Sequence, residues 1–228
     1  MPQSGAAAGA FSRWRAHLPQ EMELAPVELP GRGTRAREPM PSRFDAVADA
    51  LYEGLRPEFD LPYVLFGHSF GGMLAYEVAR RVQRDGVRAP LAVFVSGTRA
   101  PHIPQRQFVA DAEESVLLDW LSRSGGLPAE LFQFPDFLQD ILRVVRTDLR
   151  IAESYLVPEP VPLTVPLHGL AGADDVVTPP EAVPAWERCA AAGFTVTTVP
   201  GNHDFPQASA EATVAAVTSA LAGVALTE

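Results

Sequence analysis

The pattern of hydrophobic and polar residues predicts alternating strands and helices along most of the chain. Short apolar runs typical of strands lie at residues 23–29, 63–66, 91–95, 163–170 and 195–199. Helical periodicity covers residues 42–56, 70–83, 179–191 and 208–222, with Ser42 placed to cap the first of these helices. This alternation predicts an α/β fold with a mostly parallel central sheet flanked by helices.

One long segment interrupts the alternation. Residues 98–162 lie between two expected strands, and this stretch is too long for a simple crossover. Helical patterns cover residues 112–122, 129–134 and 137–155 within it. An insertion of this size between two sheet strands commonly covers an active site. We therefore expect a single domain at residues 1–228 with a helical lid insertion at about 98–162. Some residues of its apolar stripes should line an acyl channel, with ordinary helix packing as the alternative; the stripes comprise Val116, Leu117, Trp120, Leu121, Phe137, Leu138, Ile141, Leu142 and Val145.

Composition narrows the classes of function. The chain of 228 residues is 47% hydrophobic. Its formal net charge of -10 argues against a general nucleic-acid binder and against a protein that binds anionic membranes. Cys189 is the only cysteine, so neither an intrachain disulfide nor a cysteine-based zinc site is expected. No apolar run approaches the ~20 residues of a membrane span, and residues 1–10 lack signal-peptide features. We expect a cytoplasmic protein without a nucleic-acid or membrane partner.

The residues Gly-His-Ser-Phe-Gly at positions 67–71 match the pattern G-x-S-x-G. An apolar run precedes the motif and a helical pattern follows it, which is the strand-turn-helix context of a nucleophile elbow. Glycines at the flanking positions are needed because the serine sits in a strained turn with close backbone neighbours. The motif predicts an α/β-hydrolase fold with Ser69 as the nucleophile; the alternative is an incidental serine in a tight turn.

A serine hydroxyl needs a base to take its proton. The chain has five histidines, at positions 17, 68, 102, 168 and 203. His203 follows the last expected strand, which is where the base belongs in the chain order Ser, Asp, His. We expect His68 to point away from the serine and His168 to be a packed strand histidine. His203 is therefore the predicted base.

The base requires an acid that orients it. Asp174 and Asp175 both follow the strand expected at 163–170. We favour Asp175, because hydrolases of this type commonly read G-x-x-D and Gly172 sets that register; Asp174 is the alternative. Two backbone N–H groups should form the oxyanion hole, one from Phe70 and one from an early loop, where we assign Ser4. No metal or bound cofactor is needed for this chemistry.

At this point the chain resembles the type II thioesterases that accompany polyketide synthases and non-ribosomal peptide synthetases. The resemblance covers nearly the whole length. It is carried by residues 2–5 with Phe11 and Trp14; 29–32 with Arg35; 66–72 with 75–77; 96–97 with 100–101; Asp148 with 153–155; Gly172 with 174–175; Trp186; and 200–201 with His203.

The resemblance implies hydrolysis of acyl thioesters on the phosphopantetheine arm of acyl or peptidyl carrier domains, to clear aberrant acyl groups. It also implies a strand before Pro2, and Met1 stands where that strand would end. We therefore expect the family's first strand to be missing, with a misassigned start as the alternative. The sequence departs from the family in having Asp204 after the base and Asn202 before it. Two other readings stay open: a small-molecule esterase or lipase of the same fold, and a non-catalytic carrier-binding protein.

Carrier domains are usually acidic, and this chain is acidic overall, so docking would need apolar contacts or a local basic patch. The densest basic cluster consists of Arg80, Arg81, Arg84 and Arg88, near the end of the helix that follows Ser69. A solvated helix end favoured by the helix dipole is the alternative for this cluster.

Overall fold

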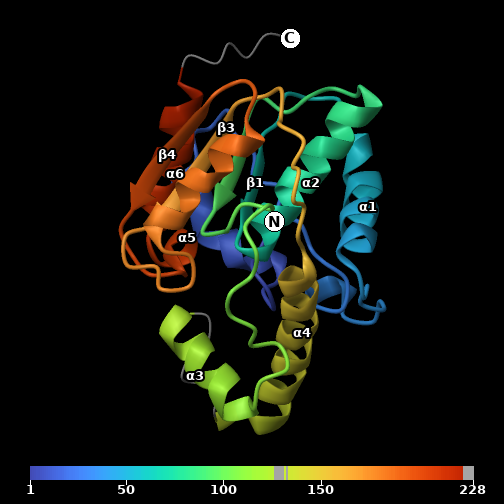
Figure 1. The fold of residues 1–228 in the computed structure, drawn as a ribbon, viewed down its shortest axis with the longest axis vertical. Coiled ribbons are helices and arrows are strands. Elements are labelled where there is room, and N and C mark those ends of the chain that lie inside the picture. Colours follow the sequence, from blue (N-terminus) through green and yellow to red (C-terminus); the bar gives the residue numbers. More distant parts are fainter. Residues whose placement is uncertain (126–130, 132, 223–228) are drawn as a thin grey trace.

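The centre of the molecule is a parallel sheet whose strands are neighbours in chain order (Figure 1). The computed structural model describes residues 1–125, 131 and 133–222. Its strands are β1 (Leu65–His68), β2 (Val93–Ser96), β3 (Leu167–Gly172) and β4 (Phe194–Val199). All three pairings are parallel, and each crossover carries helical structure, as the alternation predicts. The α/β class and the parallel sheet are confirmed.

Two helical layers bury the faces of this sheet. One layer comprises α1 (Phe44–Leu55), α2 (Phe70–Asp85) and the 3₁₀ helix η5 (Pro180–Cys189), and the other comprises the 3₁₀ helix η1 (Ala8–Ala16), α5 (Phe205–Ala208) and α6 (Ala210–Leu221). Successive residues of β2 point into different layers: Val93 and Val95 pack with the first, and Phe94 with the second. The continuous apolar run therefore reflects a strand buried on both faces.

The insertion between β2 and β3 forms a separate apolar cluster. Its helices α3 (Glu114–Ser124) and α4 (Pro135–Ser154) pack on each other through leucines and valines, and α4 also contacts α1 and α2. In Figure 1 the pair extends beyond the end of the sheet, below the start of α2. Both helices were predicted, with ends that differ by a few residues. The short helix expected at 129–134 lies half outside the described residues, because these omit 129, 130 and 132.

Three local predictions were wrong. Residues 23–29 form no strand, because Pro26 has no N–H to donate to a ladder; Leu29 is nevertheless buried in the core. Ser42 does not cap α1, since Arg43 is the N-cap residue and makes no side-chain capping bond. The segment expected as a helix at 179–191 is a 3₁₀ helix, with Pro184 inside it excluding a regular α-helical ladder.

The free edge of β1 pairs with the backbone of Met1. The Met1 nitrogen donates to the Phe66 carbonyl (2.8 Å), and His68 N–H donates to the Met1 carbonyl (3.1 Å), which is the parallel pattern around Gly67. The backbone leading into Pro2 thus lies beside β1, where the resemblance places the end of a strand. Among the described residues, the helices are too short or too polar to cross a bilayer.

Candidate active site

Ser69 occupies a strained turn between β1 and α2. Its φ of 54° and ψ of −118° make it the only non-glycine residue with positive φ in the described chain. A side chain at Gly67 would collide with the Gly71 carbonyl, and one at Gly71 would collide with the Met1 carbonyl. The motif glycines are therefore required by close backbone contacts, and the turn lifts the Ser69 hydroxyl off the end of the strand.

His203 and Asp175 form a buried hydrogen-bonded pair. Asp175 follows β3 and His203 follows β4, so parallel neighbouring strands deliver both residues to one edge of the sheet. The His203 Nδ1 lies 2.8 Å from Asp175 Oδ2. The other oxygen, Oδ1, accepts the N–H groups of Val177 (2.8 Å) and Thr178 (2.9 Å). The carboxylate is thereby fixed on both sides, and the exposed Asp174 takes no part in the pair.

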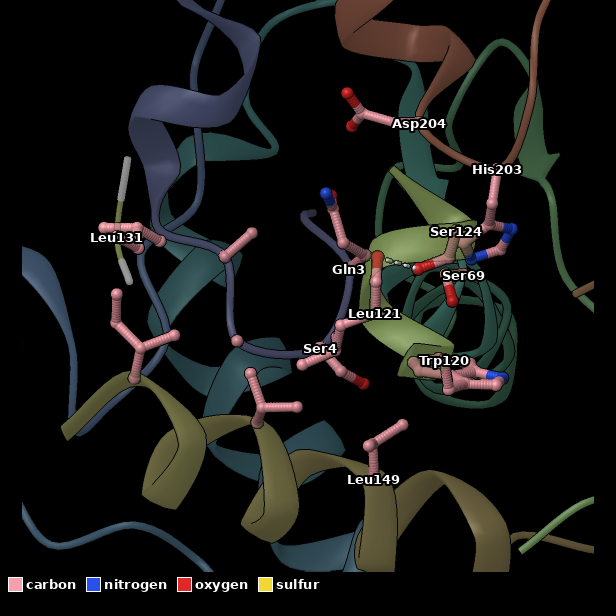
Figure 2. A pocket seen from close by; sticks show the side chains of 14 residues that line it. Gln3, Ser4, Ser69, Trp120, Leu121, Ser124, Leu131, Leu149, His203 and Asp204 are labelled. Carbon is pink, nitrogen blue, oxygen red and sulfur yellow. Dashed lines mark hydrogen bonds between the residues drawn. The ribbon is translucent and has the colours of Figure 1, made fainter. Parts of the chain in front are cut away.

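Ser69 and His203 face the same cavity, of about 200 Å³. Figure 2 shows the Ser69 side chain next to the His203 ring, at one end of this space. With Nδ1 bonded to Asp175, the Nε2 atom of His203 is the ring nitrogen left for the serine and the reacting groups. The structure therefore brings together the three side chains that the sequence proposed from distant positions.

His68 packs next to His203. Its Nδ1 is 3.0 Å from the Ser96 hydroxyl, and its ring centroid is 4.9 Å from that of His203. Burial, and then the positive charge that His203 can carry, hold the pKa of His68 well below its ordinary value. An uncharged imidazole at this position packs under His203 without opposing the formation of an imidazolium there.

The early loop supplies the second side of the site. Gln3, Ser4, Gly5 and Ala6 line the cavity together with Ser69. In the described chain, the N–H of Ser4 and that of Phe70, the first residue of α2, donate to no protein acceptor. Unpaired N–H groups on both sides of a serine are what an oxyanion hole requires.

Helices α3 and α4 form the apolar wall of the cavity. Of the insertion residues that the sequence pattern singled out, four line the cavity, namely Trp120, Leu121, Ile141 and Val145. Others from the same stripes, such as Leu138 and Leu142, pack between the two helices. Leu149 and Ser124 also line the cavity and were missed, because helical periodicity gives a face but not its far end.

Asp204 is a carboxylate that lines the cavity. It directly follows His203, and Figure 2 shows it on the cavity wall above Gln3. Burial raises its pKa to about 6, an effect that the nearby His203 and Arg13 reduce. The sequence identified Asp204 as a departure from the family pattern, but nothing in the sequence showed that it would line the cavity.

His168, another histidine considered in the sequence analysis, packs within the sheet. His168 stacks on Phe94 with ring centroids 4.9 Å apart and contacts the Thr195 hydroxyl at 2.6 Å, so it is a packed strand histidine. In the described part of the chain, no cluster of His, Cys, Asp or Glu side chains could hold a metal ion.

The four arginines of the expected basic cluster have acceptors of their own. Arg80 and Arg81 each bond Glu77 at 2.6 Å, Arg84 bonds Asp85 at 2.6 Å, and Arg88 bonds the Asp60 carbonyl at 2.6 Å. Arg80 and Arg84 also lie roughly 16 and 22 Å along α2 from Ser69, at a rise of 1.5 Å per residue. The cluster is a paired helix end remote from the cavity.

The parallel sheet and its flanking helices define the class as an α/β fold of the α/β-hydrolase type. A model of the thioesterase domain family matches residues 1–221. The chain therefore belongs to the thioesterase domain family and is a hydrolase that acts on thioester bonds.

Individual relatives agree with this family. Thioesterase PikA5 of Streptomyces venezuelae is 31% identical over 205 residues, which cover 89% of this chain and 73% of that protein. The RedJ thioesterase from the prodiginine biosynthetic pathway of Streptomyces coelicolor has a similar structure, with a TM-score of 0.86, 32% identity, and coverage of 96% and 82%. The type II thioesterase BorB from the borrelidin biosynthetic cluster gives a TM-score of 0.85, with 29% identity and coverage of 96% and 90%.

Proposed function

We propose that this protein is a type II thioesterase that removes aberrant acyl groups from the phosphopantetheine arm of carrier domains during polyketide or non-ribosomal peptide biosynthesis. The observation that carries the proposal is the buried hydrogen bond that Asp175 accepts from His203, which lines the same cavity as Ser69. The names of the relatives, which include a type II thioesterase of a biosynthetic cluster, supply the biological setting.

In the acylation step, Ser69 Oγ attacks the thioester carbonyl carbon while its proton passes to Nε2 of His203. Asp175 stabilises the imidazolium and keeps the ring in the required tautomer. The N–H groups of Phe70 and Ser4 bind the negative oxygen of the tetrahedral intermediate. When the C–S bond breaks, the phosphopantetheine sulfur takes the proton from His203 and leaves as a thiol.

In the deacylation step, water occupies the place of the thiol. Its proton passes to His203 as its oxygen attacks the ester carbonyl carbon of the acyl-enzyme. The second tetrahedral intermediate collapses with cleavage of the bond to Ser69 Oγ, which recovers the proton from His203. The products are a free carboxylic acid and unmodified Ser69. Throughout, the apolar wall formed by α3 and α4 holds the acyl group, and we regard this insertion as a lid.

The nucleophile is tested with Ser69→Ala. Turnover should fall by several orders of magnitude, leaving only what the oxyanion hole and substrate binding provide. Mass spectrometry of the wild-type protein, quenched during turnover, should place the acyl adduct on Ser69. An adduct on another residue, or an unlabelled protein after treatment with a fluorophosphonate probe, would contradict the proposal; the unlabelled protein would favour a non-catalytic carrier-binding role.

The carrier requirement is tested by placing one short acyl group on a carrier domain and on free pantetheine. Contacts with the carrier lie far from the reacting carbonyl, and their binding energy can be used to orient it, so kcat/KM should be higher for the carrier substrate. Equal kcat/KM values would contradict carrier recognition. Faster hydrolysis of simple oxygen esters than of either thioester would favour the small-molecule esterase.

A further inference from the structure

The loop that carries Ser4 is held in place by the long helix of the insertion. The N–H of Gly5 donates to Asp148 Oδ2 on α4 at a distance of 2.8 Å, across 143 residues of sequence. Gly5 also packs directly on α4: its φ is 78°, and a side chain there would collide with Val145. On its other side the loop is tied to α5, because Gln207 Nε2 donates to Gln3 Oε1 at 2.9 Å.

Asp148 is in turn paired with Arg32, in the turn that follows residues 23–29. One guanidinium nitrogen bonds Asp148 Oδ1 at 2.8 Å and another bonds Oδ2, and Arg32 also donates to the Pro30 carbonyl at 3.3 Å. Both side chains of the pair are buried, with exposures of 2% for Asp148 and 7% for Arg32. The carboxylate thus accepts from three donors, of which only the Gly5 N–H belongs to the cavity wall.

Stability alone is a weak explanation for this pair. Removing two charges from water costs free energy that their attraction barely recovers, and apolar replacements of similar volume are often neutral or stabilising. A bidentate arginine pair does, however, fix the direction of a carboxylate. Here that direction points one oxygen at the Gly5 N–H, next to the residue expected to bind the oxyanion.

The pairing also determines which loop N–H groups stay available. The Gly5 N–H is occupied by Asp148, and the Ala6 N–H donates to the Gln3 carbonyl at 3.1 Å. The N–H groups of Gln3 and Ser4 have no acceptor among the described residues. Ser4 lines the cavity together with Ser69, and its two neighbours, Gln3 and Gly5, are both held by hydrogen bonds. A shift of this loop by about 1 Å would move the Ser4 N–H out of hydrogen-bond range of the oxyanion.

We propose that Asp148, held by Arg32, is a positioning residue for the oxyanion hole: it fixes the Gln3–Ala6 loop so that the Ser4 N–H meets the oxygen of the tetrahedral intermediate on Ser69. This inference rests on the proposed function, since it presupposes an acyl transfer through Ser69. It also makes the lid helix α4 part of the catalytic apparatus, because Val145 and Leu149 on either side of Asp148 contact the acyl cavity.

The test is the double variant Arg32→Met/Asp148→Val, which replaces the ion pair by apolar side chains of similar total volume. Thermal unfolding should show a melting temperature at or above that of the wild type. On the carrier-bound substrate, kcat should nevertheless fall about 10- to 100-fold with KM changed less than about twofold, because an interaction of the transition state alone is weakened. Asp148→Asn, which keeps the size of the side chain, should lose about tenfold in kcat.

Two inhibitors separate positioning from a structural role. An alkyl boronic acid forms a tetrahedral adduct with Ser69 and places an oxygen in the oxyanion hole, whereas the pantetheine thioether of the same acyl chain resembles only the ground state. Affinity for the boronic acid should fall by the same factor as kcat/KM, and affinity for the thioether should stay unchanged. The matched control is Arg150→Gln/Asp111→Asn, which removes an exposed ion pair between α4 and the segment before α3 and should change neither affinity.

Unchanged kcat and unchanged boronic-acid affinity in the double variant and in Asp148→Asn would overturn the inference. Equal losses for the boronic acid and the thioether would also overturn it, because they would show a general disturbance of the cavity. Failure of the proposed function has a different signature, which is a Ser69→Ala variant that keeps its activity.

Discussion

At the scale of single residues, both oxygens of the Asp175 carboxylate accept hydrogen bonds. These bonds determine how an asparagine at this position would be oriented toward His203. Oδ1 accepts two backbone N–H groups, from Val177 and Thr178, while Oδ2 faces Nδ1 of His203. In an asparagine at this position the amide oxygen would be held by the two N–H donors. The amide nitrogen would then face His203 and force its proton onto Nε2. That tautomer cannot take a proton from Ser69.

Asp175→Asn should therefore keep the fold and lower kcat by about 10⁴, as the Ser-His-Asp template implies. Asp174→Asn is the matched control, because that neighbouring side chain is exposed; it should retain kcat within about twofold. Steady-state kinetics of both variants on one acyl-pantetheine substrate, with circular dichroism to check folding, measure the difference. The reverse ranking would remove Asp175 from its proposed role.

The side chains that follow a local rule could be predicted. The motif and its flanking elements identify Ser69. His203 and Asp175 can be identified because each follows an expected strand of a parallel sheet. The bond from Asp148 to Gly5 has no such signal, because it joins residues 143 positions apart whose approach depends on how α4 packs. Asp148 appeared in the sequence only as part of a resemblance, without a role.

At the scale of elements, α4 has two faces with different tasks. Leu138 and Leu142 pack toward α3, while Ile141, Val145 and Leu149 form a stripe at i, i+4 spacing along the cavity. The cavity has a volume of about 200 Å³, which is room for a short acyl chain, and we expect the side chains of this stripe to limit the length of that chain.

Ile141→Ala should lengthen the acyl chain that is preferred. The space released can hold up to three further methylene groups, and each buried methylene contributes about 0.8 kcal/mol, or roughly fourfold in kcat/KM. We expect the optimum to move toward longer chains, measured on a series of straight-chain acyl-pantetheines. Val144→Ala is the matched control, because Val144 is buried on the same helix without lining the cavity. If both variants give the profile of the wild type, α4 does not determine chain length.

Elements with strong periodicity were predictable, and the failures have local causes. The alternation located the sheet strands from β1 to β4 and the helices α1, α2, α3, α4 and α6. Residues 23–29 have the composition of a strand, but Pro26 prevents regular pairing. Leu29 is buried and Leu24 and Val27 are partly buried without forming a ladder. The helical periodicity of η5 predicted a helix there, but its 3₁₀ form follows from Pro184 inside the helix.

At the scale of the whole molecule, excess negative charge bears on both docking and stability. The net charge of -10 and the pairing of the arginines at the end of α2 leave this helix end poorly suited to an acidic carrier domain. Docking through apolar contacts is the consistent alternative, and α3 and α4 expose Val116 and Phe137 to solvent. Within this charge distribution, Asp204 is a carboxylate that the fold keeps partly away from water.

The raised pKa of Asp204 lowers the stability of the folded protein as pH rises. In the folded protein its pKa is about 6, mainly because of burial, against 3.8 for the ordinary carboxyl group. The unfolded chain therefore releases this proton at lower pH than the folded chain does, so the group lowers the free energy of unfolding as pH rises from about 4 to about 6. Below pH 4 the group is protonated in both states, and the penalty disappears.

Asp204→Asn should remove this penalty. At pH 7 the variant should have a free energy of unfolding higher than that of the wild type by about 1 kcal/mol, a value reduced from the full shift because water reaches part of the side chain. At pH 4 the two proteins should be equally stable. Urea unfolding at a series of pH values between 4 and 7 measures the difference, with Asp174→Asn as a control for the loss of one exposed negative charge. A gain that is independent of pH would mean that packing in the cavity, and not ionisation of Asp204, accounts for it.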